Sequence, residues 1–191
     1  MNWKQLRDQI RDLGFETDTS LDAYRDIAIN ACNRAIRTIN STVRPILGRY
    51  VIDHPGGFAR YDLAELTKGE DYAFESLANT PVREADGQPF PYRVEERRVV
   101  LLDIEAGEYA FFYRKRPTAI TTATPDDFDM ELDFDVQPLL PLLASYYIWL
   151  DDDERKSVMY QNMYEDLKGQ ILGGSGELAR AEIVGGFSWR S

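Results

Sequence analysis

The stretch from Val136 to Leu172 decides the fold. It reads VQPLLPLLASYYIWL over 136–150, then DDDE over 151–154, then RKSVMYQNMYEDLKGQIL over 155–172. Apolar side chains form two stripes along the first segment: Leu139, Leu143, Tyr147 and Leu150 in one, and Leu142, Tyr146 and Trp149 in the other. A helix that is apolar on every side must be covered on every side. We expect a second subunit to supply part of that cover, through Leu142, Tyr146 and Trp149. The alternative is a central helix buried within an ordinary monomer.

The second segment has one apolar stripe, which predicts a helix packed against the first. The stripe consists of Met159, Met163, Leu167 and Ile171. The acidic residues 151–154 are expected to cap this helix, because their negative charges interact favourably with the positive N-terminal end of its dipole. The small residues Gly173-Gly174-Ser175-Gly176 are expected to break the helix and to begin a flexible tail, 174–191.

Helical patterns also occupy the first 48 residues. Asn2 is a suitable N-cap, and Gly14 a suitable stop, for a short helix. A longer helix begins at Thr19 or Ser20 and ends before Pro45 and Gly48. Its inner stripe is Leu21, Tyr24, Ala28, Ala31, Ala35 and Ile39.

From Arg49 to about Pro117 the pattern changes to strands. The best predicted hairpin pairs 98–104 with 108–114 around a turn at Glu105-Ala106-Gly107. We therefore predict an α+β, mainly α protein: a helical bundle of N-terminal helices and a C-terminal helix pair, with a small antiparallel β-sheet inserted. The predicted parts are a helical domain (1–48 and 118–173), a β-hairpin region (49–117) and an extended C-terminal docking tail (174–191).

An acidic connector joins the predicted sheet to the apolar helix. Within 126–135, acidic and apolar residues alternate, which favours a strand with one charged face. Several carboxylates also invite a calcium site, but the glycine-punctuated calcium loop is missing. We therefore predict no metal.

Length, composition and charge exclude several protein classes. With 191 residues, 43% hydrophobic content and 12% aromatics, the chain belongs with folded globular proteins of one domain, or one with an insertion. A net charge of −11 argues against a nucleic-acid binder. No signal peptide or membrane-length apolar run is seen. We expect a soluble protein made in a reducing compartment, without a membrane partner.

No group of residues carries recognisable catalytic chemistry. His54 is the only histidine and Cys32 the only cysteine, and no spacing in the sequence joins them. Phosphate-binding and nucleophile-elbow motifs do not occur. The expectation is a non-enzymatic protein with no catalytic residues and no cofactor.

The layout of the chain resembles that of the head-to-tail adaptor (connector) proteins of tailed bacteriophages. The matches are Tyr24, Ile27, Ile29-Asn30 and Ala35-Ile36 in the long helix, Tyr61-Asp62-Leu63 at the start of the β part, Gly107-Glu108-Tyr109, Tyr113 and Pro117 near its end, and Leu140-Pro141, Ala144-Ser145, Asp151-Asp152, Tyr160 and Tyr164 in the helix pair. The inserted sheet is where the chain departs from smaller members of that family.

The resemblance implies a structural virion protein of the head–tail neck, assembled in the bacterial host cytoplasm. It implies a homo-oligomeric ring beneath the portal protein, twelve-fold in most members, above the next neck or tail protein. Double-stranded DNA would pass through without specific binding. The C-terminal segment would dock on the portal, through Ile183, Val184, Phe187, Trp189 and Arg190.

Two other functions are compatible with the sequence. One is a small soluble carbohydrate- or peptide-binding domain with Tyr109 and Tyr113 exposed on its ligand face. The other is a different phage neck or tail-completion protein.

Overall fold

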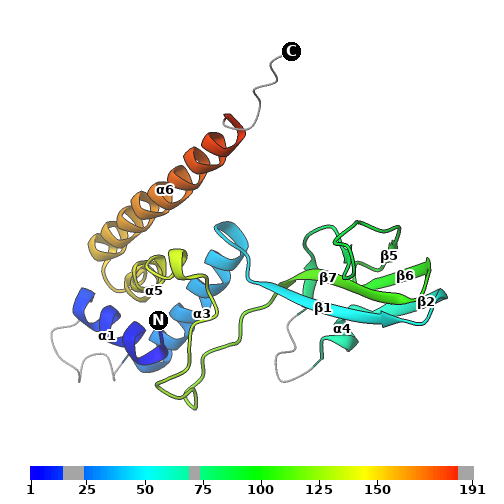
Figure 1. The fold of residues 1–191 in the computed structure, drawn as a ribbon. Helices are drawn as coiled ribbons and strands as arrows, with labels where there is room; N and C mark the ends of the chain where they lie inside the picture. The colour runs from blue at the N-terminus through cyan, green and yellow to red at the C-terminus, as the bar shows by residue number, and fades with distance from the viewer. Residues whose placement is uncertain (15–23, 69–73, 185–191) are drawn as a thin grey trace. The chain divides into compact units, whose positions relative to one another are not determined.

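The computed structural model describes residues 1–14, 24–68 and 74–184, with only the backbone of 174–184 (Figure 1). The chain divides into two compact units. The helical unit comprises Met1–Arg44 and Ala119–Ser191, and the β unit comprises Pro45–Thr118.

The described residues of the helical unit form four main helices: α1 (Trp3–Gly14), α3 (Arg25–Thr42), α5 (Leu139–Trp149) and α6 (Glu154–Val184). Asn2 begins α1 as predicted, because its side chain accepts a hydrogen bond from the amide of Gln5 at 2.9 Å. The Gln5 side chain in turn accepts a bond from the Asn2 amide, which completes a reciprocal cap. Trp3, Leu6 and Ile10 are the buried face of α1.

The apolar helix α5 packs against α1, α3 and α6 of its own chain. Its residues Leu139 to Ser145 are all buried, and so is Ile148. The cover that its sequence requires therefore comes from three helices of the same chain. Tyr146, Tyr147 and Trp149 remain half-buried, so the expectation of a second subunit rests on these residues.

The inward face of α6 differs from the predicted stripe. Tyr160 and Tyr164 are buried, whereas Met159 and Met163 are 47% and 42% exposed. Two tyrosines one turn apart thus face inward where the sequence predicted the two methionines. The Tyr160 hydroxyl bonds to the Leu13 carbonyl of α1, which favours this orientation. The sequence predicted that the acidic corner caps α6. Asp153 does so, because its side chain accepts hydrogen bonds from the backbone amides of residues 155 and 156.

The predicted helix break at Gly173–Gly176 is wrong. Helix α6 continues through these residues to Val184. Glycine lowers helix stability by roughly 0.5–1 kcal/mol relative to alanine, a cost that a helix of this length can absorb.

The β unit contains two antiparallel sheets. In the first, β1 (Leu47–His54), β7 (Gly107–Lys115) and β3 (Phe74–Leu77) lie in that order, and β4 (Val82–Arg83) also pairs with β7. In the second, the order is β2 (Gly57–Asp62), β6 (Val99–Ile104) and β5 (Arg93–Glu95). A short helix, α4 (Leu63–Leu66), follows β2.

The predicted hairpin is wrong in its pairing, although both of its strands exist. Strand β6 pairs with β2 and β5, whereas β7 pairs with β1, β3 and β4. The turn at 105–106 therefore carries the chain from one sheet to the other, as the turn at 55–56 does between β1 and β2. The sheets share one core, made of Ile52, Leu63, Ala64, Phe74, Phe90, Val100, Leu102, Tyr109 and Phe111.

The two sheets also correct the predicted fold class. The protein is α+β, with five helices and two antiparallel sheets in the described residues, and not a mainly α bundle with one small sheet. The sequence prediction missed β3 and β4. These strands have only four and two residues, too few for alternation to stand out.

The connector between the units packs along the helical unit and is not a strand. Ile120 is buried, and its backbone exchanges two 2.8 Å hydrogen bonds with the Asn33 side chain of α3. Further along, the amide of Trp3 bonds to the carbonyl of Phe128. The alternation holds for Met130 and Leu132, which are buried, and then ends at a short 3₁₀ helix, η1 (Phe134–Val136).

Candidate interaction surface

The predicted interface residues lie at different depths on α5. Leu142 is only 8% exposed, whereas Tyr146 and Trp149 are half-buried. Leu142 also lines a hollow of about 330 Å³ together with Leu13 of α1 and Pro141. Of the three, Tyr146 and Trp149 are the ones with surface left for a second molecule.

Trp149 is held by side chains from its own subunit. The ring of Tyr24 lies 6.0 Å from the Trp149 ring, and the Lys156 ammonium lies 4.0 Å from its centre. A Cβ atom on Gly14 would lie 2.7 Å from the Trp149 ring nitrogen, so this position requires glycine. A hydrogen bond to Asp152, and the charge of that carboxylate, raise the pKa of Tyr24. The acidic corner thus also contacts the start of α3.

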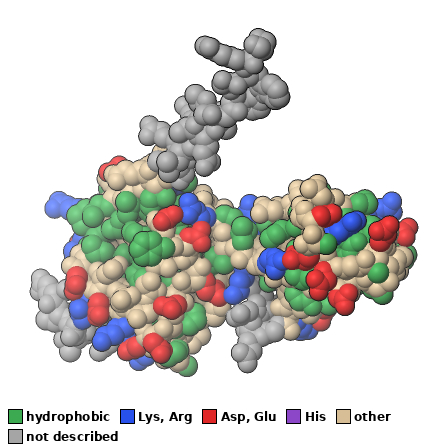
Figure 2. Space-filling view, in the orientation of Figure 1, with side chains coloured by type: hydrophobic (Ala, Val, Ile, Leu, Met, Phe, Trp, Pro, Cys, Tyr) green, Lys and Arg blue, Asp and Glu red, His purple; other side chains and the backbone are tan. Residues whose placement is uncertain are grey.

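An exposed apolar surface continues from this end of α5 onto α6. Its members with substantial exposure are Leu150, Val158, Met159 and Met163. Figure 2 shows hydrophobic side chains gathered over α5 and the adjoining part of α6. The sequence placed Met159 and Met163 on the inward face. The signal for the true inward face was the Tyr160–Tyr164 pair, because tyrosine rings one turn apart pack in a core as apolar side chains do.

Two of the predicted portal-docking residues, Ile183 and Val184, are the last residues of α6. Their side chains lie outside the described part of the chain. Phe187, Trp189 and Arg190 lie outside the described residues altogether.

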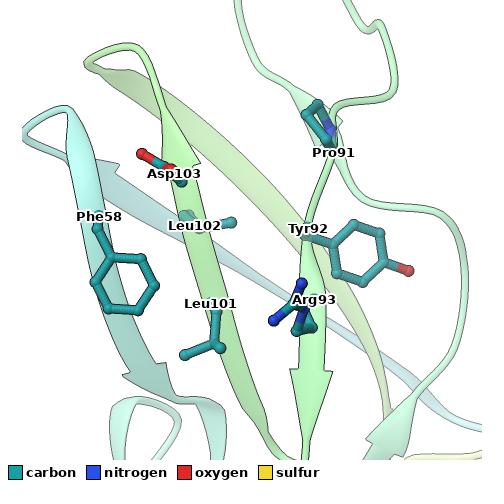
Figure 3. A pocket seen from close by; sticks show the side chains of 7 residues that line it. All are labelled: Phe58, Pro91, Tyr92, Arg93, Leu101, Leu102 and Asp103. Carbon is teal, nitrogen blue, oxygen red and sulfur yellow. The ribbon is translucent and has the colours of Figure 1, made fainter.

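A second surface feature lies on the sheet of β2, β6 and β5. This groove, the Phe58 groove, has a volume of about 350 Å³ and is lined by Phe58, Pro91, Tyr92, Arg93, Leu101, Leu102 and Asp103. Phe58 is 71% exposed. In Figure 3 Phe58 and Arg93 lie on either side of Leu101, with Asp103 farther along β6, and the Tyr92 ring points away from Phe58. None of these residues was predicted from the sequence to belong to a site.

Cys32, His54 and the acidic run 126–135 were the candidates for catalysis or metal binding, and the structure does not bring them into such an arrangement. Cys32 is fully buried, and that burial raises the pKa of its thiol to about 12. His54 is buried too, and its ring nitrogens meet the Tyr61 hydroxyl and the Gly57 carbonyl at 2.8 and 3.1 Å. In the acidic run, Asp126 pairs with Arg7, and Asp133 and Asp135 pair with Arg44. Among the described residues, no three His, Cys, Asp or Glu side chains are grouped to hold a metal ion.

None of the helices in the described ranges is both long enough and apolar enough to cross a membrane. Comparison with models of known protein families gave no match, and no characterised protein matched the sequence.

Proposed function

We propose that the chain is a head-to-tail adaptor of a tailed bacteriophage, a structural subunit of a ring beneath the portal. The ring would join the DNA-filled head to the tail and form part of the DNA channel. The proposal rests on the resemblance in layout and on one observation, the extension of α6 beyond the end of α5.

Helix α6 is longer than the bundle that it packs against. Its 31 residues correspond to about 46 Å, whereas α5 has 11 residues. Figure 1 shows the second half of α6 extending beyond α5. In the described part of the chain, no atom outside the helix lies within 4 Å of where a Cβ would stand on Gly169 or Gly173.

A helix segment without tertiary cover is only marginally stable in water. A groove on the portal would cover the end of α6, with Ile183 and Val184 as apolar contacts. Phe187, Trp189 and Arg190 would follow as anchors, because aromatic and arginine side chains dominate the energetics of many interfaces.

The charge of the chain is compatible with a DNA channel. A net charge of −11 gives a duplex little electrostatic attraction to the channel wall, so that DNA slides through without specific binding. Neighbouring subunits would meet through Tyr146 and Trp149 together with the exposed Met159 and Met163, with Leu142 beneath them.

Deletion of 174–191 tests this function. The shortened protein is expected to keep its fold and to lose attachment to the portal ring, as measured by native mass spectrometry of the mixture. Full-length protein with Leu47→Ala, an exposed apolar position in the β unit, is the matched control and is expected to attach normally. Attachment of the shortened protein at the parent level would contradict the proposed docking.

The alternative of a carbohydrate- or peptide-binding domain loses its ligand face. Tyr109 is 1% exposed and its hydroxyl donates to the Glu105 carbonyl at 2.9 Å. Tyr113 is half-buried and its ring occupies the space above Gly48. A different neck or tail-completion protein would be recognised in the same experiment by binding to the ring without direct binding to the portal.

A further inference from the structure

The most exposed large apolar side chain in the described residues is Phe134, at 84%. Phe134 is the first residue of the short helix η1, and Val136 is the last. Val136 is fully buried, so it anchors η1 in the core while Phe134 points outward. Asp133 and Asp135 flank it, each more than half exposed although both pair with Arg44. We call this acid-flanked aromatic, Asp133–Asp135, the Phe134 knob.

The Phe58 groove has the complementary chemistry. Phe58 and Leu101 give it an apolar surface (Figure 3). Leu101 faces Arg60 on one neighbouring strand and Arg93 on the other, so both arginines lie on the same face of the sheet. Both are exposed, and neither side chain has a hydrogen bond or ion pair among the described residues.

We propose that the Phe134 knob of one copy docks in the Phe58 groove of a second copy. The Phe134 ring would pack against Phe58 and Leu101, which removes apolar surface of both aromatic rings from water. The carboxylates of Asp133 and Asp135 would meet Arg60 and Arg93, because these are the unpaired cations of the groove.

The position of Asp103 sets the direction of docking. Asp103 lies opposite Phe58, two residues along β6 from the row that holds Leu101 and both arginines. Its negative charge repels an acidic partner at that end of the groove, so the flanking carboxylates of the knob face the arginine row. The charge pattern therefore admits one orientation.

Knob and groove are different surfaces of the same chain, so the contact is heterologous. In a docked pair one copy still offers its free groove and the other its free knob, so a repeated contact of this kind closes into a ring or continues as a filament. The inference rests on the proposed ring function and gives the inserted β unit a role in it, as the receptor for the neighbouring subunit.

Charge reversal tests the contact in the full-length chain. Phe134→Ala, Phe58→Ala and Arg93→Glu are each expected to weaken subunit association by about tenfold or more. The double variant Arg93→Glu with Asp135→Arg is expected to restore association, because it reverses one charge pair. Assembly is measured by sedimentation of the protein alone and by native mass spectrometry with the portal. Melting temperatures verify that each variant is folded.

The outcomes separate this inference from the proposed function. Leu47→Ala, at an exposed apolar position outside knob and groove, is the control and is expected to assemble like the parent. Normal assembly of Phe134→Ala and Phe58→Ala, or no rescue by the charge-reversed pair, would overturn the knob-and-groove contact while the ring stands. A parent that stays monomeric both alone and with the portal would overturn the contact and the ring together.

Discussion

The Nδ1 atom of His54 lies 2.8 Å from the hydroxyl oxygen of Tyr61, and this contact links the two sheets of the β unit. His54 ends β1 in one sheet, and Tyr61 belongs to β2 in the other. The Nε2 atom meets the Gly57 carbonyl at 3.1 Å, so it carries the proton, and Nδ1 accepts from the tyrosine. One side chain thus holds the turn that carries the chain between sheets.

Replacing His54 is therefore expected to destabilise the β unit. His54→Ala leaves the Tyr61 hydroxyl without this partner and opens a cavity beside Tyr109, whose ring centre lies 5.9 Å from that of His54. We expect a loss of about 1–3 kcal/mol in the free energy of unfolding. Urea denaturation followed by fluorescence measures it. Glu105→Ala, at an exposed turn position, is the control, and an equal loss in both variants would contradict the role of His54.

The orientation of α6 predicts that truncation at Tyr160 and at Met159 changes the free energy of unfolding by very different amounts. Tyr160→Ala removes a buried ring and a hydroxyl bonded to the Leu13 carbonyl, so we expect a loss of about 3–5 kcal/mol in the free energy of unfolding. Met159→Ala, at a position 47% exposed, is expected to change it by less than about 0.5 kcal/mol. Chemical denaturation of both variants decides between this orientation and the stripe predicted from the sequence, which requires the reverse order.

The sequence predicted the elements of the helical unit better than their contacts. Asn2 begins α1 because capping is local chemistry, visible within four residues. The inward face of α6 was misjudged because methionine and tyrosine stripes one residue apart are equally apolar, and only the Leu13 carbonyl distinguishes them. The long-range partner of Tyr160 is 147 residues away and leaves no local pattern.

The β unit and its groove were harder to predict for a related reason. Strands β6 and β7 follow one another across a short turn, as hairpin strands do, yet they belong to different sheets. Which strand pairs with which depends on the shared core around Phe90 and Phe111, assembled from distant segments. The Phe58 groove arises from three strands at once, so no sequence window contains it. Phe134 looked like part of an alternating strand, and only the turn at η1 exposes it.

Alkaline pH is expected to destabilise the helical unit through Cys32. Burial raises the pKa of its thiol from 9.0 to about 12, so the unfolded chain loses this proton first as the pH rises. The contribution to stability is fully present below about pH 9 and declines between pH 9 and 12, by at most about 1.4 kcal/mol per pH unit. Burial raises the pKa of Tyr160 and Tyr164 as well, which adds to the same trend.

Cys32→Ala isolates the thiol in this pH dependence. The variant is expected to be less stable at neutral pH, because it loses buried volume, but its stability should fall less steeply between pH 9 and 12. Urea denaturation at several pH values measures both effects. Equal slopes in parent and variant would show that the tyrosines alone account for the alkaline loss.

Double-stranded DNA is expected to bind the isolated protein weakly or not at all at physiological salt. The net charge of −11 opposes the phosphate contacts that supply non-specific affinity, and the exposed Arg60 and Arg93 are only two local cations. A non-specific binder would have a Kd of roughly 10⁻⁴–10⁻⁶ M with steep salt dependence. Fluorescence anisotropy of a labelled duplex, titrated at low and at physiological salt, measures the affinity. Micromolar, salt-sensitive binding that disappears in Arg60→Glu with Arg93→Glu would mean that the groove recognises DNA, and the picture of an inert channel wall would then be wrong.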